Sequence, residues 1–217
     1  MAQGQFGVEL GGGRHLQRGS FTAPCGCTFS GGVGDGFMGA LYFELPALPG
    51  LSAGVKAGVD YKQFTSAHSW TTGQTYRIDS NQIGSITLED NADIRTTYLI
   101  LEPYARYRLF STPAFLQVGA GISYLASSHF YQFRQLPNGM LFTNGSSTQV
   151  VEDGSVQDIR SMRYSAILSA GYDISLLGMT VAPMITYDLP LTDIRAVNAN
   201  GWRIASLYGS VAFRFSP

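Results

Sequence analysis

Hydrophobic and polar residues alternate along eight segments of the chain. The clearest is the stretch 98–110, in which leucines alternate with Glu102, Arg106 and Arg108. A period of two places successive side chains on opposite faces of a β-strand, so one face here is apolar and the other carries charges of both signs. The same pattern predicts strands at 3–12, 34–46, 50–64, 94–110, 113–127, 159–176, 179–189 and 202–215.

Short and long connections alternate strictly between these strands. Pro46–Gly50, Ser111–Pro113 and Leu177–Gly178 are tight and rich in turn residues. The long connections are 13–33, 65–93, 128–158 and 190–201. This arrangement is typical of an all-β, eight-stranded antiparallel up-and-down transmembrane β-barrel with short periplasmic turns and long extracellular loops. An even number of strands places both termini at the short-turn rim.

Charged residues fall on one face of the predicted sheet, with five acids and five bases. They are Glu9, Glu44, Lys56, Asp60, Glu102, Arg106, Arg108, Arg163, Asp173 and Arg214. A water-soluble barrel would bury the apolar face, but eight strands enclose too little space for so many large side chains. We therefore expect the apolar face to meet lipid and the charges to pair inside the lumen. Because an unpaired buried ion is costly, the equal count fits a closed network that fills the lumen and admits no solute.

Aromatic residues on the apolar face fall near the strand ends and predict two interfacial girdles. The girdle at the short-turn rim comprises Phe6, Phe43, Tyr107, Tyr172, Phe213 and Phe215, and the girdle at the long-loop rim comprises Phe37, Tyr61, Tyr124, Tyr164 and Tyr187. Two prolines, Pro103 and Pro183, lie inside predicted strands. Because proline has no N–H, each is expected at a bulge or a local break in the ladder.

Composition supports a membrane location. Only 13% of the 217 residues are charged, whereas about 25% is usual for a soluble domain. No run approaches the roughly 18 apolar residues of a membrane helix, so a spanning chain would cross as strands. The net charge of −1 gives no electrostatic case for nucleic acid.

With eight amphipathic strands, alternating turn lengths and the aromatic C-terminal strand SLYGSVAFRF, the chain resembles the small outer-membrane barrels of the OmpA-like, OmpX-like and PorT-like families. The resemblance implies a single barrel domain, 1–217, in the bacterial outer membrane, with periplasmic termini, lipid contacts and folding by the barrel-assembly machinery. Such barrels usually end in an aromatic residue, but Phe215 is followed by Ser216 and Pro217. A linker and a further C-terminal domain after 217 would explain this departure. The opening residues after Met1 fit a mature N-terminus.

Cys25 and Cys27 form the most unusual motif in the predicted loops. They could form a local disulfide, remain inert thiols, or bind a metal together with His15. A structural metal site needs about four ligands and only three are present, so we expect neither a metal nor a cofactor. The stretch 34–39 matches GxGxxG, but it enters a strand and opens no helix, which argues against nucleotide binding.

Two functions lead, and a soluble ligand-binding barrel, which would stay folded and monomeric without detergent, ranks third. The leading hypothesis is a non-enzymatic barrel with a structural, adhesion or partner-binding role through its outer loops, including as a subunit of an envelope complex. The third loop alternates around Pro137-Asn138-Gly139 and is expected to extend a hairpin beyond the membrane. The alternative is an enzyme acting on lipid or peptide at the loop rim, and its candidate residues are His68, Ser69, Asp90, Asp93 and His129.

Overall fold

The computed structural model consists of β-strands and their connections. It describes residues 4–23, 25–79, 82–110, 112–137, 140–142, 144–156, 158–195 and 199–215, and the side chains of these residues outside 72–84 and 199. Across these ranges it contains no helix long and apolar enough to cross a membrane.

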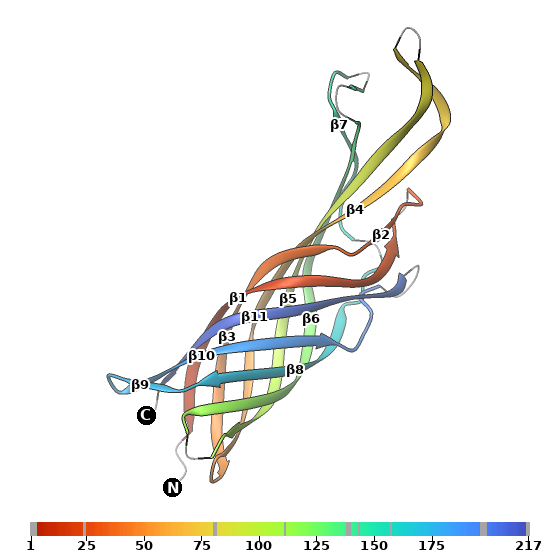
Figure 1. Cartoon of the computed structure of the whole chain (residues 1–217). Helices are drawn as coiled ribbons and strands as arrows, with labels where there is room; N and C mark the ends of the chain where they lie inside the picture. Colours follow the sequence, from red (N-terminus) through yellow and green to blue (C-terminus); the bar gives the residue numbers. More distant parts are fainter. Residues whose placement is uncertain are drawn as a thin grey trace.

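Eight strands close into an antiparallel ring (Figure 1). The order around the ring is β1, β3, β4, β5, β6, β8, β10 and β11, and pairing of β11 with both β10 and β1 closes it. Their bounds are β1 Gln5–Thr22, β3 Val33–Leu48, β4 Leu51–Asp79, β5 Gln82–Arg108, β6 Ala114–Gln135, β8 Met162–Tyr172, β10 Met179–Pro190 and β11 Ala199–Phe215. Three shorter strands, β2 Thr28–Ser30, β7 Thr148–Gly154 and β9 Ile174–Leu176, pair with β1, β6 and β10 respectively. The predicted fold class is confirmed.

Tight turns join the strands at the end that holds both termini (Figure 1). Leu177 and Gly178 connect β9 to β10 and both have positive φ, 49° and 83°, as a two-residue hairpin turn requires. Gly50, with φ 79°, closes the β3–β4 hairpin. Thr112 donates its backbone N–H to the Leu109 carbonyl between β5 and β6.

Both internal prolines lie at breaks in a ladder. The pairing of β5 with β6 skips from Leu101 to Tyr104, across Pro103. The pairing of β10 skips from Val181, which pairs with β9, to Met184, which pairs with β8. The second break separates β8 from β9 at Asp173. Each proline is therefore unpaired on one side, as its missing N–H requires. On the other side Pro103 pairs with Val55 and Pro183 pairs with Val211.

The long-loop end differs from the prediction. Residues 65–79 and 82–93, expected as loop, continue β4 and β5 as one paired hairpin. Residues 128–135 extend β6, and 13–22 extend β1. The hairpin expected around Pro137 is instead closed by the longer segment 136–147, in which 138, 139 and 143 lie outside the described residues.

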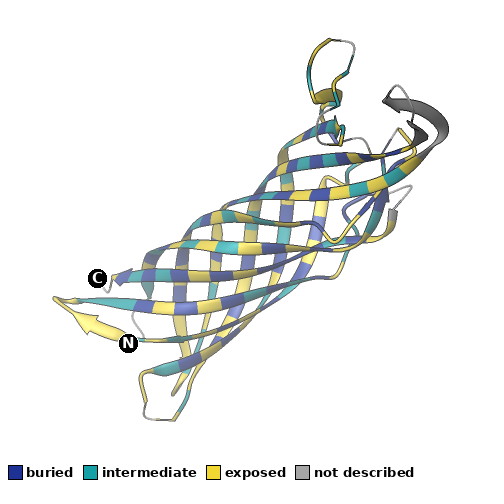
Figure 2. Cartoon of the chain, turned by 45° about the horizontal axis from the view of Figure 1, so that its top comes forward, coloured by how far each residue is buried: buried dark blue, intermediate teal, exposed yellow. Residues whose placement is uncertain are grey.

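The inner face changes character along the barrel axis, and this explains the longer strands. Toward the short-turn end the interior is charged. Above it lies an apolar plug, and burial alternates along the strands through both regions (Figure 2). The plug comprises Phe21, Ala23, Cys27, Phe29, Phe64, Ala92, Ile94, Phe130, Val156, Ile194, Trp202 and Ile204. A hydrophobic interior of this kind stabilises the paired strands at this end of the ring as it would in a soluble barrel.

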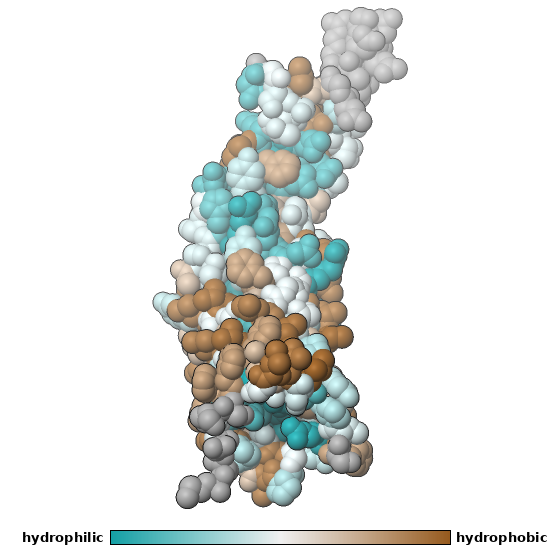
Figure 3. All heavy atoms as spheres, turned by 90° about the vertical axis from the view of Figure 1, so that its left-hand side faces the viewer, coloured by the Kyte–Doolittle hydropathy of each residue, from teal (hydrophilic) through white to brown (hydrophobic). Residues whose placement is uncertain are grey.

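Apolar residues form a broad band on the outside of the ring. Figure 3 shows them gathered in the lower half of one face, below a region rich in hydrophilic residues. Outer side chains such as Leu41 and Val118 are 66% and 54% exposed. A contiguous exposed surface of this size marks contact with lipid or protein rather than with water.

Candidate functional sites in the lumen and the outer arm

The lumen at the short-turn end holds arginines around two acids. Arg106 and Arg214 both donate to the carboxylate of Asp173, and Arg106 Nη1 lies 3.5 Å from Glu44 Oε2. The Asp173 side chain is 8% exposed. Arg108, expected in the interior, lies at the rim instead: its side chain is 56% exposed although Nη2 is 3.5 Å from Asp173 Oδ2. Its position near the strand end lets water reach the guanidinium.

A second group centres on Lys56, whose side chain is 2% exposed. Its Nζ lies 2.8 Å from Glu9 Oε2 and 3.5 Å from Glu102 Oε1. Ser210 donates to the other oxygen of Glu9 at 2.8 Å, and Gln117 donates to Glu102 at 3.1 Å. One ammonium thus serves two buried carboxylates, each supported by a neutral hydrogen bond.

The third group includes interior residues that the sequence analysis missed. Lys62 is fully buried, and its Nζ donates to Ser206 Oγ at 2.6 Å and lies 2.9 Å from Asp60 Oδ2. Asp188 binds Arg163 at 2.7 Å. Lys62 and Asp188 share the inward parity of their strands, so the alternation carried the signal that would have found them.

Little space is left between the three charged groups. One cavity, between the Asp173 and Lys56 groups, has a volume of about 10 Å³, and another, between the Lys56 and Lys62 groups, about 30 Å³. A single water needs about 10–15 Å³ on this scale. The first cavity is at the lower limit for one water and the second has room for about two, and neither is large enough for a larger solute.

Predicted girdle residues lie on the outer face. The rings of Phe6 and Phe215 are 5.7 Å apart at the short-turn end, and those of Phe37 and Tyr61 are 5.2 Å apart toward the other end. The other members, Phe43, Tyr107, Tyr124, Tyr164, Tyr172, Tyr187 and Phe213, are also exposed or half-buried on the outside.

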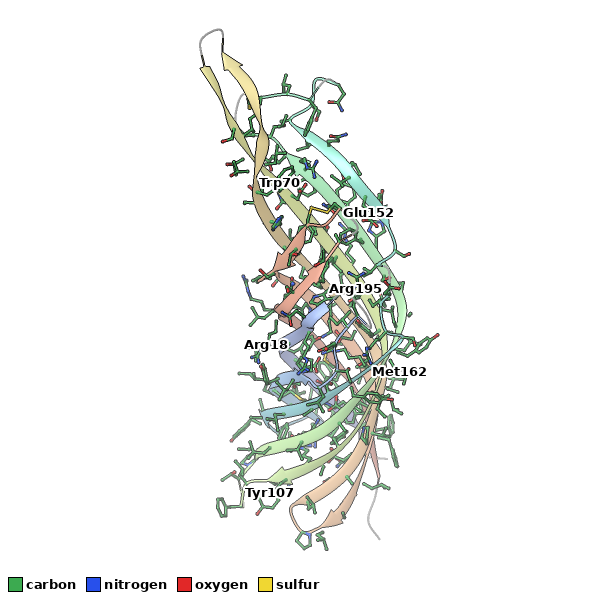
Figure 4. The ribbon with its side chains drawn as sticks, turned by 90° about the vertical axis from the view of Figure 1, so that its right-hand side faces the viewer. Arg18, Trp70, Tyr107, Glu152, Met162 and Arg195 are labelled. Atoms are coloured by element: carbon green, nitrogen blue, oxygen red, sulfur yellow. A yellow bond between two sulfur atoms is a disulfide. The ribbon has the colours of Figure 1, made fainter. Side chains whose placement is uncertain are left out.

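A sheet projects from the ring beside the plug, and Ala92 and Phe130 at its lower end also belong to the plug. This outer arm consists of residues 66–79 of β4, 82–93 of β5, 128–135 of β6 and β7. Asp90 fixes its base: the carboxylate accepts from Trp70 Nε1 at 2.8 Å and from Arg134 Nε at 2.8 Å, and the residue is fully buried. These hydrogen bonds connect three neighbouring strands at the base of the arm. Trp70 and Glu152 are labelled on the arm in Figure 4.

Cys25 and Cys27 are joined by a disulfide beside this base (Figure 4). Gln132 Nε2 lies 3.2 Å from Cys25 Sγ. His15 is not near them: it is buried inside the barrel, where Nδ1 is 2.9 Å from Ser206 Oγ. The residues of the metal alternative are therefore not brought together, and no cluster of three or more metal-ligating acids, histidines or cysteines occurs among the described residues.

Of the candidate catalytic residues, His68 of β4 and Asp90 of β5 are cross-strand partners, whereas His129 of β6 is opposite Arg95. His129 Nε2 pairs with Asp153 at 2.9 Å, with both side chains half exposed or more. The His68 ring contacts Phe29, and Ser69 is exposed on the opposite face of β4. The Asp90 carboxylate accepts the hydrogen bonds from Trp70 and Arg134 described above. Asp93 accepts from Arg95 at 2.8 Å, and this hydrogen bond raises the pKa of Arg95.

Comparisons with known proteins find likeness in structure. No protein-family model matches the chain, and neither does any curated protein. The attachment invasion locus protein Ail of Yersinia pestis, in complex with the heparin analogue sucrose octasulfate, is 10% identical over 98% of this chain and 99% of that chain, with a TM-score of 0.37. The outer membrane protein OprG from Pseudomonas aeruginosa is 12% identical over 100% and 98%, with a TM-score of 0.39.

The outer membrane protease OmpT from Escherichia coli is 12% identical over 99% of this chain and 97% of that chain, with a TM-score of 0.35. These structures include outer-membrane barrels, in line with the resemblance seen in the sequence. At such scores the likeness carries no argument about activity, and the barrel architecture rests on this structure itself.

Proposed function

We propose that this chain is a non-enzymatic integral barrel of the bacterial outer membrane, closed to solutes, that binds a partner or surface through its outer arm. The location is supported by an apolar outer wall around a charged interior, an arrangement that is stable only where lipid covers the wall. Both termini would then lie on the periplasmic side, opposite the arm.

The observation that carries the proposed role is the fixed base of the arm. A loop without a function has no need for a fully buried carboxylate that holds a tryptophan and an arginine from neighbouring strands. Such a base keeps the hairpin in a constant orientation, which lowers the ordering cost of binding. Beside the base, on the barrel side of Arg134, β6 carries the adjacent half-buried rings of Tyr131 and Phe133, 5.9 Å apart, and Val150 of β7, which is paired with Phe133, is 53% exposed. Aromatic residues that are partly accessible are typical anchors of protein interfaces.

A trimmed arm tests this role. Thr71 and Thr87 are cross-strand partners, so an Asn-Gly turn can replace residues 72–86 and close the hairpin there. The same trimmed variant carries Tyr131→Ser and Phe133→Ser, which remove the two adjacent rings and keep the base. We expect cells that display the full chain to adhere to immobilised proteins or glycans, and the trimmed variant to lose most of this adherence. Its migration on a gel before and after boiling, unchanged from the full chain, controls for folding. Equal adherence of a folded trimmed variant would contradict the proposal.

A further inference from the structure

A pair of glycines hollows the lipid-facing wall. Gly12 of β1 and Gly209 of β11 lie directly opposite each other on the outer face. On the neighbouring strands, Gly209 pairs with Ile185 of β10 and Gly12 pairs with Phe37 of β3. These two side chains are 63% and 60% exposed. With Val211 below, these residues line an open recess of about 820 Å³, within the range of small-molecule sites.

Nothing in the fold requires glycine at these two positions. A Cβ on Gly209 would meet no atom within 4 Å, and one on Gly12 would meet only the Gly36 carbonyl oxygen at 3.9 Å. Neither residue is among the glycines with positive φ. Glycine inside a strand weakens it, because it costs chain entropy and packs no side chain. The recess itself is therefore what these glycines provide.

Arginines lie on the same wall, on the side toward the arm. Arg14 is the next outward residue above Gly12, about 7 Å along the strand. Further up, Arg18 is the cross-strand partner of Arg203, and like charges in this position repel. Arg18 lies on β1 at about mid-height, well below Trp70 (Figure 4).

The guanidinium of Arg18 extends toward the girdle at the long-loop rim, where it donates to Tyr187 Oη at 3.0 Å. Two of these arginines, Arg203 and Arg14, have an acidic partner. Asp193 binds Arg203 at 2.7 Å, and Asp35 lies 4.0 Å from Arg14, with both side chains of the latter pair more than 60% exposed. Within the described part of the chain, Arg18 has no acidic partner.

We propose that this wall binds one phosphorylated lipid of the leaflet on the arm side, with an acyl chain in the Gly12–Gly209 recess and the phosphate at Arg14 and Arg18. The recess lies in the apolar band, where a chain is the available occupant, and the cationic groups lie at the depth of Tyr187, where headgroups meet the aromatic girdle. Arginine stems can lie along the apolar wall while the guanidinium makes charge-assisted bonds to phosphate. The inference needs the barrel to be in a membrane but does not depend on what the arm binds.

Native mass spectrometry of the full chain in a neutral detergent tests the proposal, with dimyristoyl phosphatidic acid as the probe. We expect the native protein to retain one lipid. The variants Gly12→Leu/Gly209→Leu and Arg14→Gln/Arg18→Gln should each bind it about tenfold more weakly, the scale of one lost charge-assisted bond. Matched controls are Ala57→Leu on the outer face of β4 and Arg95→Gln on that of β5, and both should bind as the native protein does.

Two further probes separate the parts of the ligand. Dimyristoylglycerol, which lacks the phosphate, should bind weakly and lose affinity only in the recess variant. Inorganic phosphate should not displace the lipid; displacement would mean a free-anion site and overturn the proposal. Lipid affinity unchanged in the folded recess variant, or an equal loss in the two controls, would overturn it as well. Gly12→Val takes the place of the double recess variant if that variant does not fold, as judged by gel migration before and after boiling.

Discussion

At the scale of single residues, the interior is an arrangement of buried charges in which each ion depends on a few neighbours. Nine such residues could be identified from the sequence because the polar face of every strand repeats at a period of two. The pairing itself could not be predicted, because it depends on the stagger between strands. Lys62 and Asp188 were missed although they have the right parity, and Arg108 was misplaced because the pattern does not show where the wall ends.

Lys56 offers the sharpest test at this scale. Replacement by methionine leaves the carboxylates of Glu9 and Glu102 buried without a cation, and breaking a buried pair in this way costs about 3–5 kcal/mol. We expect a loss of that order in the free energy of unfolding, measured by urea denaturation in detergent micelles.

The matched variant Lys56→Met/Glu9→Gln/Glu102→Gln removes the charges together and should recover most of this loss. Arg95→Gln, which breaks an exposed pair with Asp93, should change the stability by less than about 1 kcal/mol. If Lys56→Met costs no more than Arg95→Gln, the interior network does not stabilise the barrel.

At the scale of elements, the strands within the apolar band were predicted well and those beyond it were not. The alternation inverts where the wall leaves the band: inside, charges give way to the apolar plug, and outside, apolar residues give way to polar ones. If the rule for the apolar band, with an apolar outer face and a charged inner face, is applied to the upper segments, they resemble polar loops. An irregularity at Ala126, where Thr97 pairs with Ser127 but Tyr98 pairs with Leu125, also shifts the inward parity of β6, and no sequence signal marks it.

The plug makes a prediction about Trp202, which is fully buried and whose ring centroid lies 4.4 Å from that of Phe21. Replacement by alanine opens a cavity among aromatic side chains, and such changes cost about 3–5 kcal/mol. Urea denaturation should show this loss for Trp202→Ala. The surface variant Leu141→Ala, at a residue 64% exposed, serves as the control. Equal stability of the two variants would mean that the outer strands do not depend on the plug.

At the scale of the whole molecule, the account rests on which face of the ring meets lipid. Residues of β6 test this directly, because Leu116 and Val118 face outward and are 48% and 54% exposed, while Gln117 between them is 4% exposed. A nitroxide spin label can be attached at each position in turn, in a Cys25→Ser/Cys27→Ser background and in phosphatidylcholine vesicles. Its collision rates with oxygen, which concentrates in lipid, and with a water-soluble nickel chelate are then measured.

The account predicts high oxygen and low nickel accessibility at Leu116 and Val118, and low accessibility to both reagents at Gln117. High nickel accessibility at Leu116 and Val118 would contradict it, because the apolar wall would then face water.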